Sequence, residues 1–247
     1  MKTGTADKIK AILKNSVDAT LNRIKKKKSF RPFHEALLSK AIVNAAAFER
    51  SFSTSFGQGA VEAIASLAAM DAGYEVERQK VTFVNVYKGA LDEIRRNLNA
   101  LREGEKKPNW KREIERLAAF SKGDTEVIRV ISDLYLKKED QEIFISVKTV
   151  KPNLDQTEIA KKDMLLLKAH DPSYQTYFGL FYNPGGTERK DYNWMIPFKL
   201  FDMHHDECVL IGKDFWNTIG GKNTYTDLIE IFAEVGAYTK QRIIEQG

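Results

Sequence analysis

Hydrophobic positions in the first part of the chain recur at helical spacing. Apolar side chains lie three or four positions apart within residues 6–24, and similar patterns cover about 34–50 and 59–70. This periodicity predicts three amphipathic helices. Residues 1–50 are therefore expected to form an N-terminal helical region.

The middle of the chain changes from extended to helical patterning and then to strands. Residues 74–83 have the pattern of a strand, and a helical insertion is expected over 86–122. Hydrophobic and polar residues then alternate along 126–136 and 142–150, with a charged turn between the two runs. Such alternation on both sides of a short polar turn predicts a β-hairpin.

The remaining pattern completes an α/β core. A helix is expected over 155–169 with Asp155 as its N-cap, followed by an apolar strand over 177–182. The order helix, strand, strand, strand, helix, strand is typical of a mixed central sheet flanked by helices. With 247 residues and no internal repeat, the chain is expected to form a single domain over 1–247.

Composition places the chain among globular proteins. It is 43% hydrophobic and 30% charged, and no apolar run is long enough to span a membrane. The N-terminus lacks the apolar segment of a secretory signal, and the single Cys208 excludes a disulfide framework. A cytoplasmic protein without a membrane partner is expected.

The charge of the chain permits a nucleic-acid partner without requiring one. Lysine and arginine number 39 against 34 aspartate and glutamate residues, which gives a net charge of +5. The densest basic segment is Lys25–Lys28, flanked by Arg23 and Arg31. Such a run is either a solvated helix end or a contact for a polyanion, and the sequence leaves both interpretations open.

The hairpin brings chemically active side chains together. Residues of equal parity share a face of a strand, so Phe144, Ser146 and Lys148 are expected to point away from the core and Val147 into it. Antiparallel pairing would place the carboxylate of Asp133, near the end of the preceding strand, beside Ser146 and Lys148. A carboxylate next to a lysine has the parts of a metal-dependent phosphodiesterase site, although an ordinary ion pair explains the same residues.

Two stretches of the hairpin resemble a known active site. Ser132–Tyr135 and Ile145–Asn153 look like the active-site hairpin of PD-(D/E)XK nucleases. The Lys-Thr pair and the Lys-Pro-Asn tail of the second stretch, together with Lys213–Gly221, are more narrowly similar to TdeIII-like type II restriction endonucleases. The resemblance covers about residues 31–236. It implies a PD-(D/E)XK restriction-endonuclease-like core and Mg²⁺-dependent cleavage of double-stranded DNA.

The resemblance also implies roles for particular residues. Asp133 would ligate Mg²⁺, with the carbonyl of Val147 as a further ligand. Lys148 would orient or activate the attacking water and stabilise charge on the phosphate. Glu62, in the helix before the sheet, matches in type the carboxylate that many nucleases of this superfamily contribute from such a helix. A solvent-facing glutamate is the simpler interpretation of Glu62.

Ser146 departs from the family pattern, which has aspartate or glutamate at this position. A hydroxyl cannot replace the charge of a carboxylate at a divalent cation, so the site lacks one ligand. The carboxylate has moved elsewhere, the serine is an inactivating substitution, or the protein no longer cuts DNA; we favour the first explanation. Glu158 is the first candidate for the moved carboxylate, although with Asp155 it also has capping-box spacing. Asp163 is a weaker candidate.

A restriction enzyme must also hold and read DNA. In the donor-rich loop after the last apolar strand, Arg189, Lys190 and Asn193 are candidates for base contacts in the major groove. Lys151 and Asn153, just past the hairpin, are expected to contact phosphates. The resemblance further implies a palindromic site of the GG-N-CC kind and hence a twofold homodimer in a prokaryotic cytoplasm.

Two other functions fit the same sequence. A DNA-binding protein on this scaffold could have lost cleavage, as the missing carboxylate at Ser146 allows. A repair or junction nuclease would recognise the structure of DNA rather than its base sequence. Incubation with plasmid DNA and Mg²⁺ distinguishes the three, because only a restriction enzyme gives discrete bands.

Overall fold

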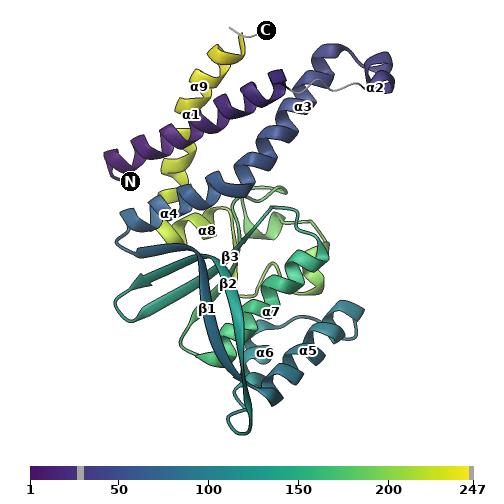
Figure 1. Cartoon of the computed structure of the whole chain (residues 1–247), viewed down its shortest axis with the longest axis vertical. Helices are drawn as coiled ribbons and strands as arrows, with labels where there is room; N and C mark the ends of the chain where they lie inside the picture. Colours follow the sequence, from purple (N-terminus) through teal and green to yellow (C-terminus); the bar gives the residue numbers. More distant parts are fainter. Residues whose placement is uncertain (27–30, 245–247) are drawn as a thin grey trace.

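The computed structural model describes residues 1–26 and 31–244, which form a mixed sheet with helices on both faces (Figure 1). The first and second strand pairs along the sheet are antiparallel, whereas the third and fourth pairs are parallel. The expected α/β class and mixed sheet are therefore confirmed. In sheet order the strands are β1 (Glu75–Tyr87), β2 (Thr125–Lys138), β3 (Gln141–Lys148), β4 (Gln175–Leu180) and β5 (Val209–Ile211).

The N-terminal region is helical, as its periodicity predicts. The single helix predicted over 34–50 is wrong, because Leu38 is extended and Ser39 begins a new helix by accepting a hydrogen bond from the amide of Ile42 at 3.4 Å. Two lysines of the basic run, Lys27 and Lys28, lie outside the described residues. The elements are α1 (Thr3–Lys26), α2 (Pro32–Leu37), α3 (Lys40–Ser55), a π-helical turn (Phe56–Ala60) and α4 (Val61–Asp71).

Helices also fill the predicted insertion and the end of the chain. The two helices of the insertion, α5 and α6, fall within the predicted limits, and β1 continues directly into α5. Helix α9 lies beside α1, which also packs on α3, at the end of the molecule away from the insertion (Figure 1). Within the described residues, no helix combines the length and apolar character that a membrane span requires. The remaining helices are α5 (Lys88–Glu103), α6 (Trp110–Leu117), α7 (Leu154–His170), α8 (Lys213–Gly220) and α9 (Thr224–Ile244).

Hydrophobic cores fill both faces of the sheet. Ile145 of β3 packs with residues of α4 and α8 on one face, and Phe144 packs with residues of α5 and α7 on the other. Phe144 is only 2% exposed, so the prediction that its face points away from the core is wrong. Helices α5 and α7 cover this face at Phe144, whereas Ser146 and Lys148, at the end of β3, stay partly open.

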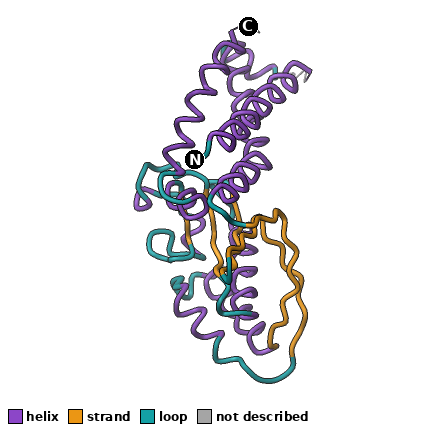
Figure 2. Tube along the Cα trace, turned by 90° about the vertical axis from the view of Figure 1, so that its left-hand side faces the viewer, coloured by secondary structure: helices purple, strands orange, loops and turns teal. Residues whose placement is uncertain are grey.

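Strands β1 and β2 form a long, curved ribbon (Figure 2), and the ribbon contributes to both cores. Val76 and Leu134 belong to the core that contains α4, whereas Val84 and Val130, an even number of positions away on the same strands, belong to the core that contains α5 and α7. The pairing register does not slip between these positions, so the ribbon itself turns. Gln79 lies at this turn with a φ of 52°, which non-glycine residues rarely adopt.

The start of α7 differs from the prediction. Asn153, not Asp155, is the N-cap, because its side chain accepts a hydrogen bond from the amide of Gln156 at 2.8 Å. The side chain of Gln156 in turn accepts one from the amide of Asn153 at 3.3 Å. This reciprocal pair satisfies two donors at the helix start. Glu158 therefore has no part in the cap.

Candidate active site

Asp133 lies where the pairing between β2 and β3 ends. The last regular pair is Leu134 with Ile145, and beyond it the Oδ2 atom of Asp133 accepts a hydrogen bond from the amide of Val147 at 2.8 Å. The same oxygen accepts one from Nζ of Lys148 at 3.0 Å and one from Oγ of Ser146 at 3.4 Å. The predicted closeness of the carboxylate, the hydroxyl and the ammonium group is confirmed.

The ion pair lies at the end of β3, where solvent can reach it. The side chains of Asp133 and Lys148 are 19% and 21% exposed. Helix α7 contributes Asp163 to the surroundings of the pair. Burial raises the pKa of Asp163 to about 6, with Lys148 opposing this shift and Asp133 adding to it. The carboxyl group of Asp163 therefore lies within the electrostatic field of the pair.

Glu62 brings a second carboxylate to Asp133 from the other side of the ribbon. It lies in the first turn of α4, and its side chain is only 14% exposed, so it is not a solvent-facing glutamate. Its Oε2 atom accepts hydrogen bonds from Nε2 of Gln79 at 3.3 Å and from Nη2 of Arg78 at 3.4 Å. The same Nε2 atom of Gln79 donates to Oδ1 of Asp133 at 3.2 Å.

Arg78 and Gln79 were not among the predicted site residues. Periodicity places both in a strand and says nothing about their contacts with Glu62, which lies 16 positions before Arg78 and 17 before Gln79. The turn of the ribbon at Gln79 also has no sequence signal, because glycine, asparagine and aspartate are the residues that mark a positive φ. Both residues reach the site because α4 packs against β1, and this contact is visible only in the folded structure.

Glu158, the first candidate for the moved carboxylate, is directed elsewhere. It forms an ion pair with Arg102 of α5, and Arg102 also contacts Asp155 at 2.9 Å. In the part of the chain that the structure describes, no hydrogen bond or ion pair joins Glu158 to Ser146 or Lys148. The structure thus brings Glu62, rather than Glu158, to the carboxylate of Asp133.

The residues predicted to contact DNA have different surroundings. Lys151 is exposed, with Nζ 5.6 Å from the centre of the Trp194 ring, whereas the side chain of Asn153 caps α7. The guanidinium group of Arg189 donates to the carbonyls of Met203 and Asp206, so it points into this chain.

The other two predicted base-reading residues face solvent. Lys190 belongs to a short 3₁₀ turn (Arg189–Asp191), and Asn193 follows this turn. Both residues are exposed. Of the three loop residues predicted to read bases, Lys190 and Asn193 are therefore the accessible ones.

The donor set at Asp133 suits magnesium. Among the described residues, no group of three or more His, Cys, Asp or Glu side chains surrounds a single ion position. Mg²⁺ usually takes one or two carboxylates and fills its other positions with water and phosphate oxygens. Asp133 and Glu62 supply two carboxylates that converge on one amide nitrogen of Gln79. These residues therefore fit the coordination habit of Mg²⁺.

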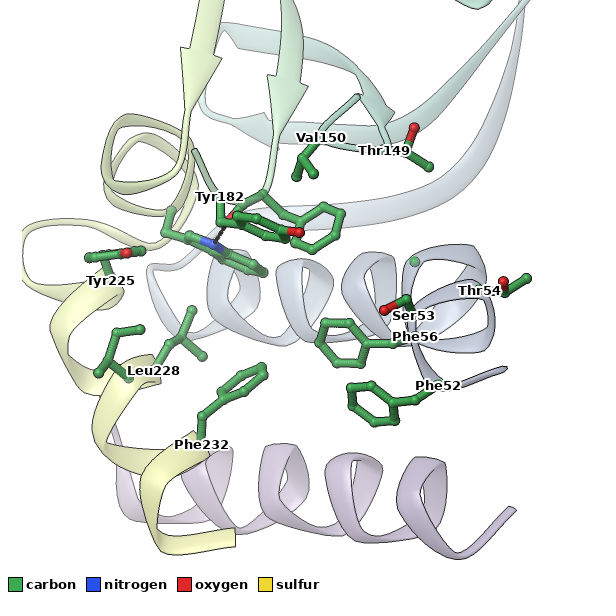
Figure 3. A pocket seen from close by; sticks show the side chains of 14 residues that line it. Phe52, Ser53, Thr54, Phe56, Thr149, Val150, Tyr182, Tyr225, Leu228 and Phe232 are labelled. Atoms are coloured by element: carbon green, nitrogen blue, oxygen red, sulfur yellow. Dashed lines mark hydrogen bonds between the residues drawn. The ribbon is translucent and has the colours of Figure 1, made fainter. Parts of the chain in front are cut away.

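An apolar pocket of about 620 Å³ begins where β3 ends (Figure 3). Thr149 and Val150, which follow Lys148, form part of its wall, and aromatic rings such as Phe56 and Phe232 form much of the rest. None of its lining residues is charged. Asp133, Lys148 and Glu62 are not among its lining residues, so the polar cluster lies beside this pocket rather than in it.

The fold and the cluster together define a class of enzyme. An antiparallel hairpin that carries a carboxylate and a lysine, continued by parallel strands and flanked by helices, is the arrangement of the PD-(D/E)XK nuclease core. The family model described as "Type II restriction endonuclease, HinfI" matches residues 1–236, and the chain belongs to this family. It is therefore a site-specific deoxyribonuclease.

Curated type II restriction enzymes are similar to this protein over most of its chain. HgiCII of Herpetosiphon aurantiacus is 27% identical in an alignment that covers 94% of this chain and 87% of the relative. HgiEI of the same organism is 28% identical over 93% of this chain and 86% of the relative. MjaII of Methanocaldococcus jannaschii is 26% identical over 74% of this chain and 52% of the relative. No solved structure matches the chain.

Proposed function

We propose that Asp133, Lys148 and Glu62 form the site at which this restriction endonuclease hydrolyses DNA with Mg²⁺. One observation carries the proposal: Asp133 contacts the ammonium group of Lys148 through one oxygen and shares the amide of Gln79 with Glu62 through the other. A cation and a scissile phosphate at this place would meet two carboxylates and one lysine. These are the groups that phosphodiester hydrolysis requires.

Each residue has a distinct part in the proposed reaction. Asp133 and Glu62 would hold Mg²⁺, with the carbonyl of Val147 as a further ligand. Lys148 would donate hydrogen bonds to the attacking water or to a phosphate oxygen, which orients the nucleophile and stabilises charge in the transition state. When bound, Mg²⁺ supplies positive charge that polarises the phosphate and lowers the pKa of water.

The same arrangement explains how the enzyme can stay active with a serine at position 146, where the family pattern has an acid. Its hydroxyl donates to Asp133 instead of ligating an ion, while Glu62 provides the second carboxylate from α4. Glu158 is left out of the proposed site because it pairs with Arg102. In this proposal the second carboxylate ligand comes from Glu62 of α4 instead of from position 146.

The substrate of this site is double-stranded DNA with a short palindromic sequence. The resemblance of the hairpin supports a site of the GG-N-CC kind, within a restriction–modification system of a prokaryotic cytoplasm. Lys151 would contact phosphate, while Lys190 and Asn193 would be available to read bases, because all three are exposed. In this arrangement Arg189 and Asn153 do not contact DNA, because Arg189 binds carbonyls of its own chain and Asn153 caps α7.

A palindromic site favours a twofold homodimer, and α2 offers a surface for it. Phe33 and Leu37 are 81% and 84% exposed, and α2 contains no buried residue. A helix of six residues gains too little from its own hydrogen bonds to be stable in water. Burial of these side chains against a second copy of the chain would stabilise α2 and place one active site on each strand.

Cleavage of plasmid DNA with Mg²⁺ tests the proposed site. Lys148→Ala should lower the rate of cleavage by about a thousandfold, because it removes a charge that stabilises the transition state, while DNA binding stays intact. Lys137→Ala, at an exposed lysine near the end of β2, is the matched control and should cut normally. Normal cleavage by Lys148→Ala would exclude this site. Binding without cutting by the unsubstituted protein would support the inactive scaffold, and a preference for branched DNA would support a repair nuclease.

Restoring the acid at Ser146 separates a rearranged site from an inactivated one. In Ser146→Glu a new carboxylate would lie beside Asp133, and the two negative charges would repel each other. The new carboxylate would also compete with Asp133 for the ammonium group of Lys148. We expect cleavage to fall or to stay unchanged in this variant. Ser146→Ala is the control and should keep most of its activity. A large gain of activity in Ser146→Glu would show that the second carboxylate does not come from Glu62.

A further inference from the structure

The side chain of Gln79 contacts both carboxylates of the proposed site. Its Nε2 atom donates to Oδ1 of Asp133 at 3.2 Å and to Oε2 of Glu62 at 3.3 Å. An amide nitrogen carries two hydrogens, and here each one has a carboxylate acceptor. A single neutral group therefore bridges two acidic residues from different elements, β2 and α4.

This bridge holds the carboxylates close without neutralising them. The amide provides hydrogen bonds but no net positive charge, so the negative charges of Asp133 and Glu62 still repel each other. Lys148 and Arg78 offset part of this repulsion from the outer sides, at 3.0 Å from Asp133 and 3.4 Å from Glu62. The amide of Gln79 occupies the place between the two oxygens.

The backbone of Gln79 is strained at the same place. Its φ of 52° is unfavourable for a residue with a Cβ atom. Arg78 and Lys80 pair regularly with Leu134 and Ser132, whereas Gln79, opposite Asp133, lies outside the regular pairing. Strain of this kind persists where surrounding contacts over-determine a conformation, often at functional sites.

We propose that Gln79 is a positioning residue whose amide competes with divalent cations for Asp133 and Glu62. The nitrogen lies more than 3 Å from each oxygen, whereas a bound Mg²⁺ would lie about 2 Å from them in the same place. Amide and ion cannot occupy this place together. Cation binding by both carboxylates therefore breaks both hydrogen bonds of Gln79, which lowers the affinity of the site. The inference rests on the proposed function, because it takes Asp133 and Glu62 as ligands.

Binding of Mn²⁺ to the full-length, DNA-free protein tests the competition. Gln79→Gly removes the amide and accepts a positive φ, while Gln79→Asn also tolerates this φ but carries an amide that is one methylene shorter. Both variants should bind Mn²⁺ about tenfold more tightly than the unsubstituted protein, because the lost hydrogen bonds no longer oppose binding. Calorimetry and the electron spin resonance of free Mn²⁺ measure the affinity, and thermal unfolding in EDTA confirms that each variant folds.

A second glutamine and a ligand variant serve as controls. Gln141, five residues before Ser146 on β3, donates its amide to Gln175 at 3.0 Å, and Gln141→Asn should leave the Mn²⁺ affinity unchanged. Asp133→Asn should abolish binding in every background. Unchanged or weaker binding in both Gln79 variants, with binding still dependent on Asp133, overturns the competition alone. Binding that does not depend on Asp133 overturns the proposed site, and this inference with it.

Discussion

Asp163 of α7 is a partly buried carboxyl group in the electrostatic field of Asp133 and Lys148. Burial disfavours the charged carboxylate and raises its pKa to about 6, which outweighs the opposing effects of Lys162 and Lys148. The folded protein therefore holds a proton on Asp163 at pH values where the unfolded chain has released it. A group with a raised folded-state pKa contributes stability below its unfolded pKa, near 4, and loses this contribution as the pH rises through about 6.

Asp163→Asn should therefore stabilise the protein at neutral pH and have little effect at pH 4. Because the side chain is only partly buried, we expect a gain of about 1 to 2 kcal/mol in the free energy of unfolding at pH 7. Urea unfolding in EDTA at both pH values measures the difference, and Asp140→Asn, at an exposed position in the hairpin turn, is the control. An equal effect of Asp163→Asn at pH 4 and pH 7 would contradict the assigned pKa.

At the scale of elements, the sequence predicts what local periodicity determines. The hairpin, the closeness of Asp133 to Lys148, and the order of strands β1 to β4 with α7 between the last two follow from alternation and helical spacing. The features that the sequence does not predict depend mainly on contacts between distant segments. Strand β5 is only three residues long and is defined by its pairing with β4. The cap of α7 is a local exception, because Asn153, two residues before the predicted Asp155, forms reciprocal hydrogen bonds with Gln156. Glu62 meets Asp133 only through the packing of α4 on the ribbon.

The insertion is joined to α7 by a buried ion pair. Lys161 of α7 is 0% exposed, and Glu113 of α6 is 4% exposed. The ammonium group also donates to the carbonyl of Leu200 and lies 4.7 Å from the centre of the Phe201 ring. Helix α6 is thereby fixed to α7, which packs on the face of the sheet that carries Phe144.

Removing one partner of this pair should destabilise the protein more than removing both. Lys161→Met leaves the carboxylate of Glu113 buried and unpaired, which should cost about 3 to 5 kcal/mol of unfolding free energy. The double variant Lys161→Met/Glu113→Leu removes both charges and should recover most of this loss. Chemical denaturation of the single and double variants measures the difference. Equal losses in both would show that packing, rather than charge pairing, joins α6 to α7.

At the scale of the whole molecule, one chain carries one proposed site and a palindrome presents two scissile bonds. The pair formed by Asp133 and Lys148 is a single cluster at the end of the hairpin. Two chains related by a twofold axis would place one such cluster on each strand of the duplex. Cleavage of both strands in one binding event would then require two intact subunits.

Mixed dimers should therefore nick DNA. Co-expression of the unsubstituted chain and Lys148→Ala, each with a different affinity tag, allows dimers with one site of each kind to be purified. Such dimers should convert supercoiled plasmid to the open circular form, because the inactive subunit leaves its strand uncut, and linear DNA should appear only slowly. Unsubstituted dimers should give linear DNA directly, and dimers of Lys148→Ala should give neither product. Rapid linear product from purified mixed dimers would mean that one site cuts both strands in turn, and the twofold arrangement would not be needed for cleavage.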